Sequence, residues 1–187
     1  MRNGRLPTDA SEFQNKLPQG YTEVFDVVDL KDRIIGQASR KIVHEKKLIH
    51  RSIHILVFNS QNRLFLQKRS LEKDESPGLW DSSVSGHVDA GEGYNESALR
   101  ELWEELGIKT KIKLWIKLTA VEETFWEHVS VYKCVTDEKM ILNPTEISDG
   151  KFWNLYEIKV CIKKNPERFT PTLKIIFDRL IRSMENN

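Results

Sequence analysis

Three glutamates, Glu101, Glu104 and Glu105, are spaced so that they can act together on one ligand. The residues from about Tyr94 to Leu106 have helical periodicity, which places the three carboxylates within an arc of about 100°. The adjoining arc of the helix is apolar and faces the core. Carboxylate oxygens are the ligands that Mg²⁺ prefers. The spacing therefore predicts a divalent-cation site, and the alternative is a solvated charged face.

The position of these acids within the helix favours the cation site. Glu104 and Glu105 come just before Gly107, which is placed to end the helix in a left-handed conformation. The carbonyl end of a helix carries partial negative charge, and Glu101 repels Glu105 at i, i+4, so each effect costs a few tenths of a kcal/mol. A bound cation reverses both effects. The glycine-punctuated loop 86–93 before the helix can bring its backbone carbonyls close to the same ligand.

The whole chain fits one domain with a real core. Its 187 residues suggest a polar arm over residues 1–20 and a single domain over 21–187. With 29 Lys plus Arg against 28 Asp plus Glu, no global field draws it to nucleic acid. No apolar run approaches the roughly 20 residues of a membrane helix. Two cysteines form no disulfide framework, so we expect a reducing cytoplasm. A homodimer is compatible with the sequence.

Strand and helix signals surround the acidic helix. Strands are expected at residues 21–29, 52–59, 64–69, 109–119, 129–136 and 152–155, and helices at 33–45, 94–106, 155–164 and 171–184. Segments 52–59 and 64–69 have hairpin spacing. Loop signals cover residues 73–78 and 80–85. Strands mixed with helices at both ends predict an α/β sandwich around one sheet.

Residues 86–108, GHVDAGEGYNESALRELWEELGI, resemble the Nudix box, G-x5-E-x7-R-E-U-x-E-E-x-G-U with U aliphatic. Every specified position is filled, by Gly86, Glu92, Arg100, Glu101, Leu102, Glu104, Glu105, Gly107 and Ile108. Average residue usage makes such a match a chance event on the order of once in a billion starting positions. The resemblance implies the Nudix fold, a mixed β-sheet between α-helices. It also implies a hydrolase that cleaves a diphosphate linked to another moiety, using Mg²⁺ or Mn²⁺.

The resemblance assigns metal-binding roles by position. Glu104 and Glu105 become the main metal ligands, Glu101 becomes a further ligand or helper, and the Gly86 carbonyl is an additional candidate ligand. A residue well after the box, Glu146, is the candidate general base or extra ligand. Its rivals are Glu122, Glu123 and Glu127, and any of the four can instead be solvated.

Other positions have supporting roles. Arg100 and Glu92 are expected to pair and to hold the carboxylates in place. Arg51, Arg69 and His87 are the candidate phosphate contacts. The alternative for both arginines is an ordinary exposed basic residue, and for Arg100 a surface arginine.

A wider likeness, from about residue 23 to 180, points to the branch related to isopentenyl-diphosphate isomerase. It is carried by EVFDVVD, HRSIHILVFN, LFLQKRS, SPGLWDSSVSGH and NPERFTP. His50 and His87 match metal-binding positions of the isomerase, although a hydrogen-bonding or phosphate-facing role is the alternative. His54 lies between apolar residues and is expected to be packed structurally.

Two departures from the isomerase separate this chain from that reaction. The isomerase has a reactive cysteine where this chain has Ser85, and a second acid at the position of Val129, two residues after Glu127. Serine cannot supply thiol chemistry because its pKa is far higher. Hydrolysis of a small organic diphosphate, such as a nucleoside diphosphate linked to another group, is therefore expected. The alternatives are an isomerase-like enzyme and a non-catalytic binding module, although a module would be expected to lose box carboxylates.

Overall fold

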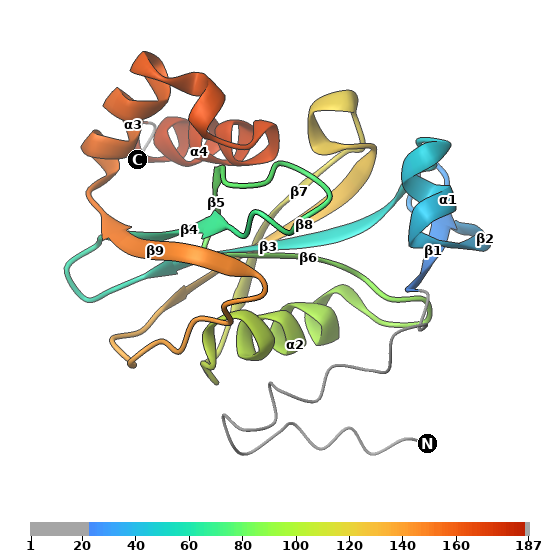
Figure 1. The fold of residues 1–187 in the computed structure, drawn as a ribbon, viewed down its shortest axis with the longest axis horizontal. Coiled ribbons are helices and arrows are strands. Elements are labelled where there is room, and N and C mark those ends of the chain that lie inside the picture. Colours follow the sequence, from blue (N-terminus) through green and yellow to red (C-terminus); the bar gives the residue numbers. More distant parts are fainter. Residues whose placement is uncertain (1–22, 186–187) are drawn as a thin grey trace.

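The computed structural model describes residues 23–185, so the predicted arm over residues 1–20 lies outside the described part of the chain. A seven-stranded mixed sheet dominates the fold (Figure 1). Its strands are β3 (His50–Phe58), β4 (Leu64–Arg69), β5 (Trp80–Asp81), β6 (Val84–His87), β7 (Lys113–Leu118), β8 (Glu127–Val135) and β9 (Ile147–Trp153). The order is β5-β4-β3-β8-β7, with β6 paired to β3 and β9 paired to β4. Only the β3–β8 pairing is parallel among the described strands.

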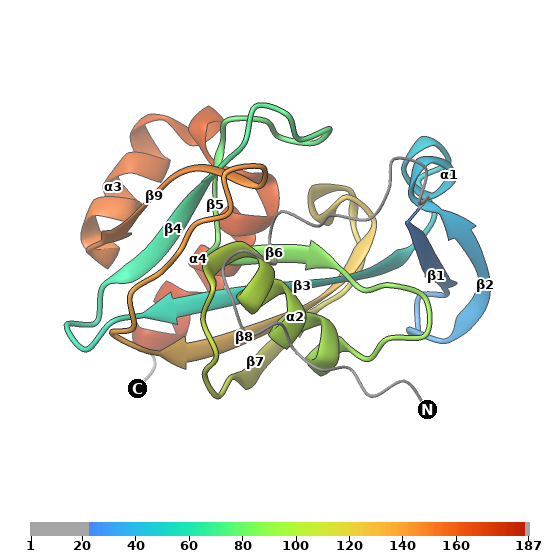
Figure 2. The ribbon, with the colours of Figure 1, turned by 60° about the horizontal axis from the view of Figure 1, so that its bottom comes forward.

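The predicted hairpin of β3 and β4 is splayed. The two strands pair at a single register position, Phe58 with Leu64. Further along, β3 pairs with β6 over Ser52–Ile55, and β4 pairs with β5 and β9 (Figure 2). The prediction of a loop over residues 80–85 was therefore wrong in part. Small polar residues such as Ser82 and Ser83 resemble a loop in sequence, but they are buried here beside strand edges that the splayed hairpin leaves open.

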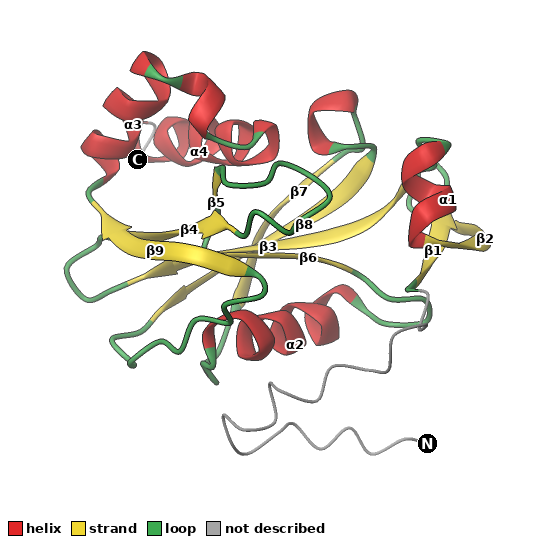
Figure 3. Ribbon diagram, viewed as in Figure 1, coloured by secondary structure: helices red, strands yellow, loops and turns green. Residues whose placement is uncertain are grey.

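Helices cover both faces of the sheet. Helix α2 (Tyr94–Leu106) lies on one face, and α3 (Leu155–Lys164) and α4 (Pro171–Glu185) lie on the other (Figure 3). Short 3₁₀ turns occur at Glu122–Thr124 and Pro166–Arg168. This arrangement confirms the predicted α/β sandwich. No helix within residues 23–185 is long and apolar enough to cross a membrane.

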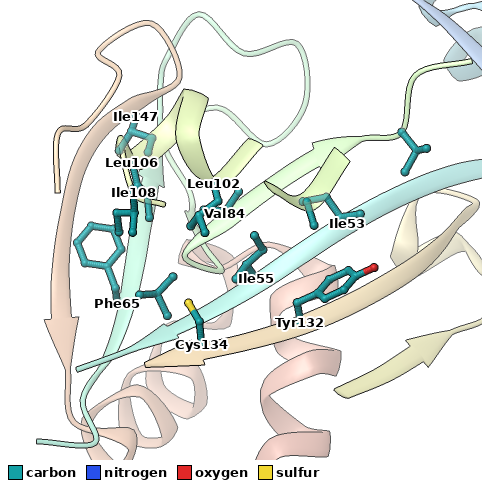
Figure 4. Close-up of a cluster of buried hydrophobic side chains, with 13 residues drawn as sticks. Ile53, Ile55, Phe65, Val84, Leu102, Leu106, Ile108, Tyr132, Cys134 and Ile147 are labelled. Atoms are coloured by element: carbon teal, nitrogen blue, oxygen red, sulfur yellow. The ribbon is translucent and has the colours of Figure 1, made fainter. Parts of the chain in front are cut away.

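Alternation along the strands produces two apolar layers. Ile53, Ile55 and Phe65 face α2, where Leu102 and Leu106 meet them (Figure 4). Neighbouring positions point the opposite way, towards α3 and α4, and form the second layer. The period of two along each strand thus separates the sheet into two chemically distinct faces.

A two-stranded sheet, β1 (Val24–Val28) with β2 (Ile34–Ser39), stands at one end of the molecule beside α1 (Arg40–Glu45). The helix expected over residues 33–45 is thus a strand in its first half. The reversal between the strands is a side-chain-capped turn, because the Asp29 carboxylate accepts from the backbone N–H groups of Lys31 and Arg33. Asp32 has a φ of 62°, which helical continuation would not permit.

Candidate active site

Helix α2 has the limits that the sequence predicts. It begins after Gly93, whose backbone N–H donates to the Glu96 carboxylate at 3.4 Å. It ends at Gly107, which has a left-handed φ of 66° and donates its N–H to the Trp103 carbonyl at 2.8 Å. These two caps fix where the acidic residues fall along the helix.

The three box glutamates differ in exposure. Glu105 is 2% exposed, the Glu101 side chain is 15% exposed, and the Glu104 side chain is 49% exposed. The alternative of a solvated charged face therefore applies to Glu104 alone. Two carboxylates so close to the core need compensating partners, because burying an unpaired charge is costly.

Glu105 accepts its hydrogen bonds from two neutral donors. Its Oε2 accepts from the Gln67 side-chain amide at 2.8 Å and from the Ser85 backbone N–H at 3.3 Å. Burial, followed by the charge of Glu101, raises the pKa of Glu105 well above its usual value. A group held in this way gains strongly from a nearby cation.

Glu101 lies against the backbone of Gly86. A Cβ atom at position 86 would overlap the Glu101 carboxylate, so only glycine lets strand β6 approach the helix this closely. Burial raises the pKa of Glu101 from 4.5 to about 7, although the charge of Arg100 acts in the opposite direction. The backbone of Gly86 thus lies directly beside the Glu101 carboxylate.

Arg100 connects the helix to the loop that precedes it. Its Nε and Nη2 donate to Glu92 at 3.2 and 2.9 Å, which is the predicted pairing. Its Nη1 donates to Glu101 at 2.8 Å and to Glu104 at 3.1 Å. Ser97 adds a hydroxyl donor to Glu92 at 2.5 Å. One guanidinium therefore holds the carboxylates of Glu92, Glu101 and Glu104 in a fixed relation.

Glu146 reaches the same cluster from a distant part of the sequence. The segment before β9 docks on the carboxyl end of α2, where the N–H of Asn143 donates to the Glu105 carbonyl at 3.0 Å. Glu146 forms an ion pair with Lys73, and its charge contributes to the raised pKa of Glu105. Its rivals Glu122 and Glu123 are exposed near the 3₁₀ turn before β8.

The two arginines predicted to contact phosphate, Arg69 and Arg51, lie in different places. Arg69 points towards the cluster, since its Nη1 lies 3.3 Å from the Ser85 hydroxyl and its charge lowers the pKa of Glu105. The structure does not bring Arg51 there. Its guanidinium donates to the Asp32 carboxylate at 2.6 Å and to the Asp32 carbonyl at 2.7 Å, tying β3 to the β1–β2 turn. The carboxylate and the carbonyl of Asp32 thus hold this arginine at the turn and away from the acidic cluster.

Next to Gly86 on β6, His87 joins a second cluster that includes His44, His50, Glu75 and Glu127. The candidate ligand atoms of the three histidines lie within 4.8 Å of one another, as do those of Glu75, His87 and Glu127. The backbone positions Glu127 through two consecutive residues with positive φ, Phe125 and Trp126 at 54° and 62°. Such strained residues cluster at functional sites.

Hydrogen bonds set the ring orientations in this second cluster. His50 Nδ1 donates to the Leu48 carbonyl at 2.9 Å, and His44 Nδ1 lies 2.8 Å from Glu75 Oε1. The Nε2 of His50 lies 3.5 Å from Glu127 Oε1, whereas the Nε2 of His44 is buried without a hydrogen-bond partner. A ring that is held through Nδ1 and turns Nε2 into the cluster has the arrangement of a metal-ligating histidine.

His87 is oriented differently. Its Nδ1 accepts from Arg40 at 3.3 Å, so its Nε2 carries the proton that is donated to Glu127 at 3.1 Å. Burial lowers the pKa of His87. Burial alone would raise the pKa of Glu127, but the His50 and His87 imidazoles hold it well below its usual range. The cluster therefore pairs neutral His87 with an ionised carboxylate. Both ring nitrogens of His87 are bound by protein groups, so neither is directed at a phosphate.

Four residues of these clusters escaped the sequence analysis, namely Gln67, Lys73, His44 and Glu75. Gln67 could have been found, because it is two residues after Phe65 and so shares its face of the strand, directly after the apolar residues 64–66. Lys73 lies in a charged loop segment with no periodicity. His54, in contrast, is buried and hydrogen-bonded to Ser82 at 2.6 Å, in agreement with its predicted structural role.

Comparisons with known proteins agree with this geometry. The NUDIX domain family model matches residues 48–174. An isopentenyl-diphosphate Delta-isomerase 2 of Photorhabdus laumondii is 32% identical over 163 residues, covering 84% of this chain and 92% of the relative. An uncharacterized Nudix hydrolase of Pseudomonas aeruginosa is 38% identical over 133 residues, covering 70% of this chain and 78% of the relative.

Among solved structures, a protein from Deinococcus radiodurans matches with a TM-score of 0.75 and 27% identity, covering 84% of this chain and 98% of that one. The relatives thus include both hydrolases and isomerases of one fold, and Ser85 stands where the isomerase resemblance requires a cysteine. The chain belongs to the Nudix hydrolase family, in the branch that resembles isopentenyl-diphosphate isomerase.

Proposed function

We propose that this enzyme hydrolyses the diphosphate bond of a small organic diphosphate with the help of Mg²⁺. The observation that carries the proposal is the meeting of buried Glu105 and partly buried Glu101, both with a raised pKa, with Glu146 from a separate segment. Such a group of acids has more negative charge than its neighbours neutralise. A hard divalent cation fits this set of oxygen donors, and Mn²⁺ fits it as well.

The residues that would hold the cation are Glu101, Glu104 and Glu105, with the Gly86 carbonyl as a further oxygen donor. When bound, the ion supplies charge neutralisation of the diphosphate and a lowered pKa for water. Arg100 keeps Glu101 and Glu104 in register with Glu92, so it positions the ligands without touching the substrate.

Proton transfer from the attacking water needs a carboxylate at the edge of the cluster. Glu146 is suited to this task, because its side chain is 17% exposed and it approaches from outside the helix. A buried box glutamate is the alternative acceptor. Arg69, directed at Ser85 beside Glu105, is placed to receive phosphate oxygens.

The test is a screen with Mg²⁺ of nucleoside diphosphates and triphosphates, dinucleotide polyphosphates, sugar nucleotides and prenyl diphosphates. We expect Glu104→Gln and Glu105→Gln to lower kcat by about 100-fold or more, because metal ligands are lost. Glu122→Gln makes the same chemical change on a carboxylate that is 77% exposed, and it should retain full activity. Full turnover in both box variants would refute the assignment. Hydrolysis of the best substrate in ¹⁸O-labelled water identifies the attacked phosphorus.

An isomerase-like reaction is the second candidate, and the histidine cluster with Glu127 favours it. Two features oppose it. Ser85 offers a hydroxyl, within 3.4 Å of Asp81, in place of a thiol, and Val129 is buried in the apolar layer under α3 and α4. Conversion of isopentenyl diphosphate to its isomer by the unmodified enzyme would overturn the hydrolase assignment. A non-catalytic module would bind a diphosphate in the same screen without cleaving it.

A further inference from the structure

Segment 70–79, between β4 and β5, carries three consecutive charged residues that pair with two separate parts of the chain. Lys73 pairs with Glu146 before β9. Asp74 lies 3.5 Å from Arg40 of α1, and Glu75 lies 2.8 Å from His44 of the same helix. The backbone is held as well, because Arg69 Nε donates to the Glu75 carbonyl at 3.0 Å. The segment therefore fixes the Lys73 ammonium beside the acidic cluster.

The ammonium group of Lys73 interacts electrostatically with the less exposed acids of this cluster. Its charge opposes the raised pKa of both Glu101 and Glu105. The neighbouring arginines divide their hydrogen bonds among several partners, since Arg100 binds Glu92, Glu101 and Glu104. Arg69 is shared between Asp81, Ser85 and the Glu75 carbonyl. The Lys73 side chain is only 23% exposed, so water screens its charge weakly.

We propose that Lys73 is an internal counter-ion of the metal-free site, and that it competes with the divalent cation for the carboxylates of Glu101, Glu105 and Glu146. The inference rests on the proposed metal-dependent function. A lysine ammonium and a divalent cation repel each other at short range in a poorly screened site. Entry of the cation must therefore weaken the Lys73–Glu146 pair, and the free energy of breaking that pair is subtracted from the affinity for metal.

The arrangement has a consequence for the metal-free protein. In the absence of Lys73, the carboxylates of Glu101, Glu105 and Glu146 would repel one another without this neighbouring ammonium. With it, the site keeps a cation before Mg²⁺ arrives. Lys73 therefore stabilises the metal-free fold and lowers metal affinity at the same time, and one substitution should change the two quantities in opposite directions.

The experiment measures Mn²⁺ binding by electron paramagnetic resonance and calorimetry, without substrate, in four proteins. Lys73→Met keeps the length of the side chain and removes its charge, and we expect it to bind Mn²⁺ about tenfold more tightly than the wild type. Lys73→Arg keeps the charge and should bind as the wild type does. The control Lys41→Met breaks another Lys–Glu pair, that of Lys41 and Glu45 on exposed α1, and should leave Mn²⁺ affinity unchanged.

Thermal melting gives the second readout. Metal-free Lys73→Met should melt at a lower temperature than the wild type, and saturating Mn²⁺ should close the difference. If Lys73→Met does not fold, Lys73→Gln provides the same test. Equal or weaker Mn²⁺ binding in the uncharged variant would overturn the role of Lys73. Absence of Mn²⁺ binding in every protein, including the wild type, would instead overturn the proposed metal site.

Discussion

Glu101 is an acid whose pKa the fold raises to about 7, against an ordinary value of 4.5. Burial is the main cause, and the charge of Glu104 adds to it. The proton is therefore bound more tightly in the folded protein than in the unfolded chain. This preference favours the fold fully below about pH 4.5, and it disappears as pH rises through about 7.

We therefore predict that metal-free protein loses stability between pH 4.5 and 7 relative to the variant Glu101→Gln, which cannot ionise. The expected relative loss is about 1 to 3 kcal/mol in the free energy of unfolding. Urea denaturation of both proteins at several pH values measures it. Saturating Mg²⁺ at pH 7 should restore stability to the wild type only. Parallel pH profiles without metal would contradict the raised pKa.

The tight packing at Gly86 allows a second prediction for a single residue. Because an added Cβ would overlap the Glu101 carboxylate, Gly86→Ala must displace the Glu101 side chain or push β6 and α2 apart. We expect a loss of about 1 to 3 kcal/mol in stability and weaker Mn²⁺ binding. Gly36→Ala is the matched control, since a Cβ there meets no atom within 4 Å. Calorimetry and urea denaturation follow both variants, and equal behaviour of the two would disprove the close packing.

The helices and strands differ in how well they can be predicted from the sequence. The limits of α2 could be predicted because both of its ends carry local signals, Gly93 with Glu96 and the left-handed Gly107. The strand β2 could not, because Ile34–Ser39 lacks clear alternation and pairs only with β1. The short strands β5 and β6 also lack a local signal, since their partners are the edges of a splayed hairpin.

The candidate site divides in the same way. The box acids follow a dense local pattern within one helix and its loop, so the sequence indicates them together. The partners Gln67, Lys73 and Glu146 arrive through β4, the following loop and the segment before β9. Their placement depends on long-range strand pairing, such as Arg69 with Ile147. Arg51 shows the opposite case. The sequence suggests a phosphate contact for it, but Asp32 binds it in the folded protein.

At the scale of α2, Arg100 is the residue that joins helix and loop. Its planar group donates to Glu92 in two places and to Glu101 and Glu104 in one each, which the single ammonium of lysine cannot reproduce. We predict that Arg100→Lys lowers the free energy of unfolding by about 2 kcal/mol and weakens Mn²⁺ binding. Arg33→Lys changes an exposed arginine paired with Asp29 and should cost less than about 0.5 kcal/mol. Chemical denaturation decides between a connecting role and a surface role.

Across the whole molecule, β6 lies between two clusters of different chemistry. Ser85 and Gly86 contact the carboxylates of α2, whereas His87 belongs to the histidine cluster with Glu127. Oxygen donors select hard cations such as Mg²⁺, and imidazole suits borderline ions such as Co²⁺ or Zn²⁺. The single strand β6 thus lies between a cluster of oxygen donors and a cluster rich in imidazole, which should prefer different cations.

This separation predicts that the two clusters respond to different ions. Mg²⁺ at about ten times its dissociation constant should raise the melting temperature of the wild type by about 3 to 6 °C, through binding to the folded state alone. The shift should vanish in Glu105→Gln and persist in His44→Asn, which removes the unpartnered imidazole nitrogen of that residue. Co²⁺ should show the reverse dependence, with visible absorption bands of a nitrogen-ligated ion that are lost in His44→Asn. If His44→Asn removes the Mg²⁺ shift, or Glu105→Gln removes the Co²⁺ bands, the clusters act as one site and the assignment of separate cation preferences fails.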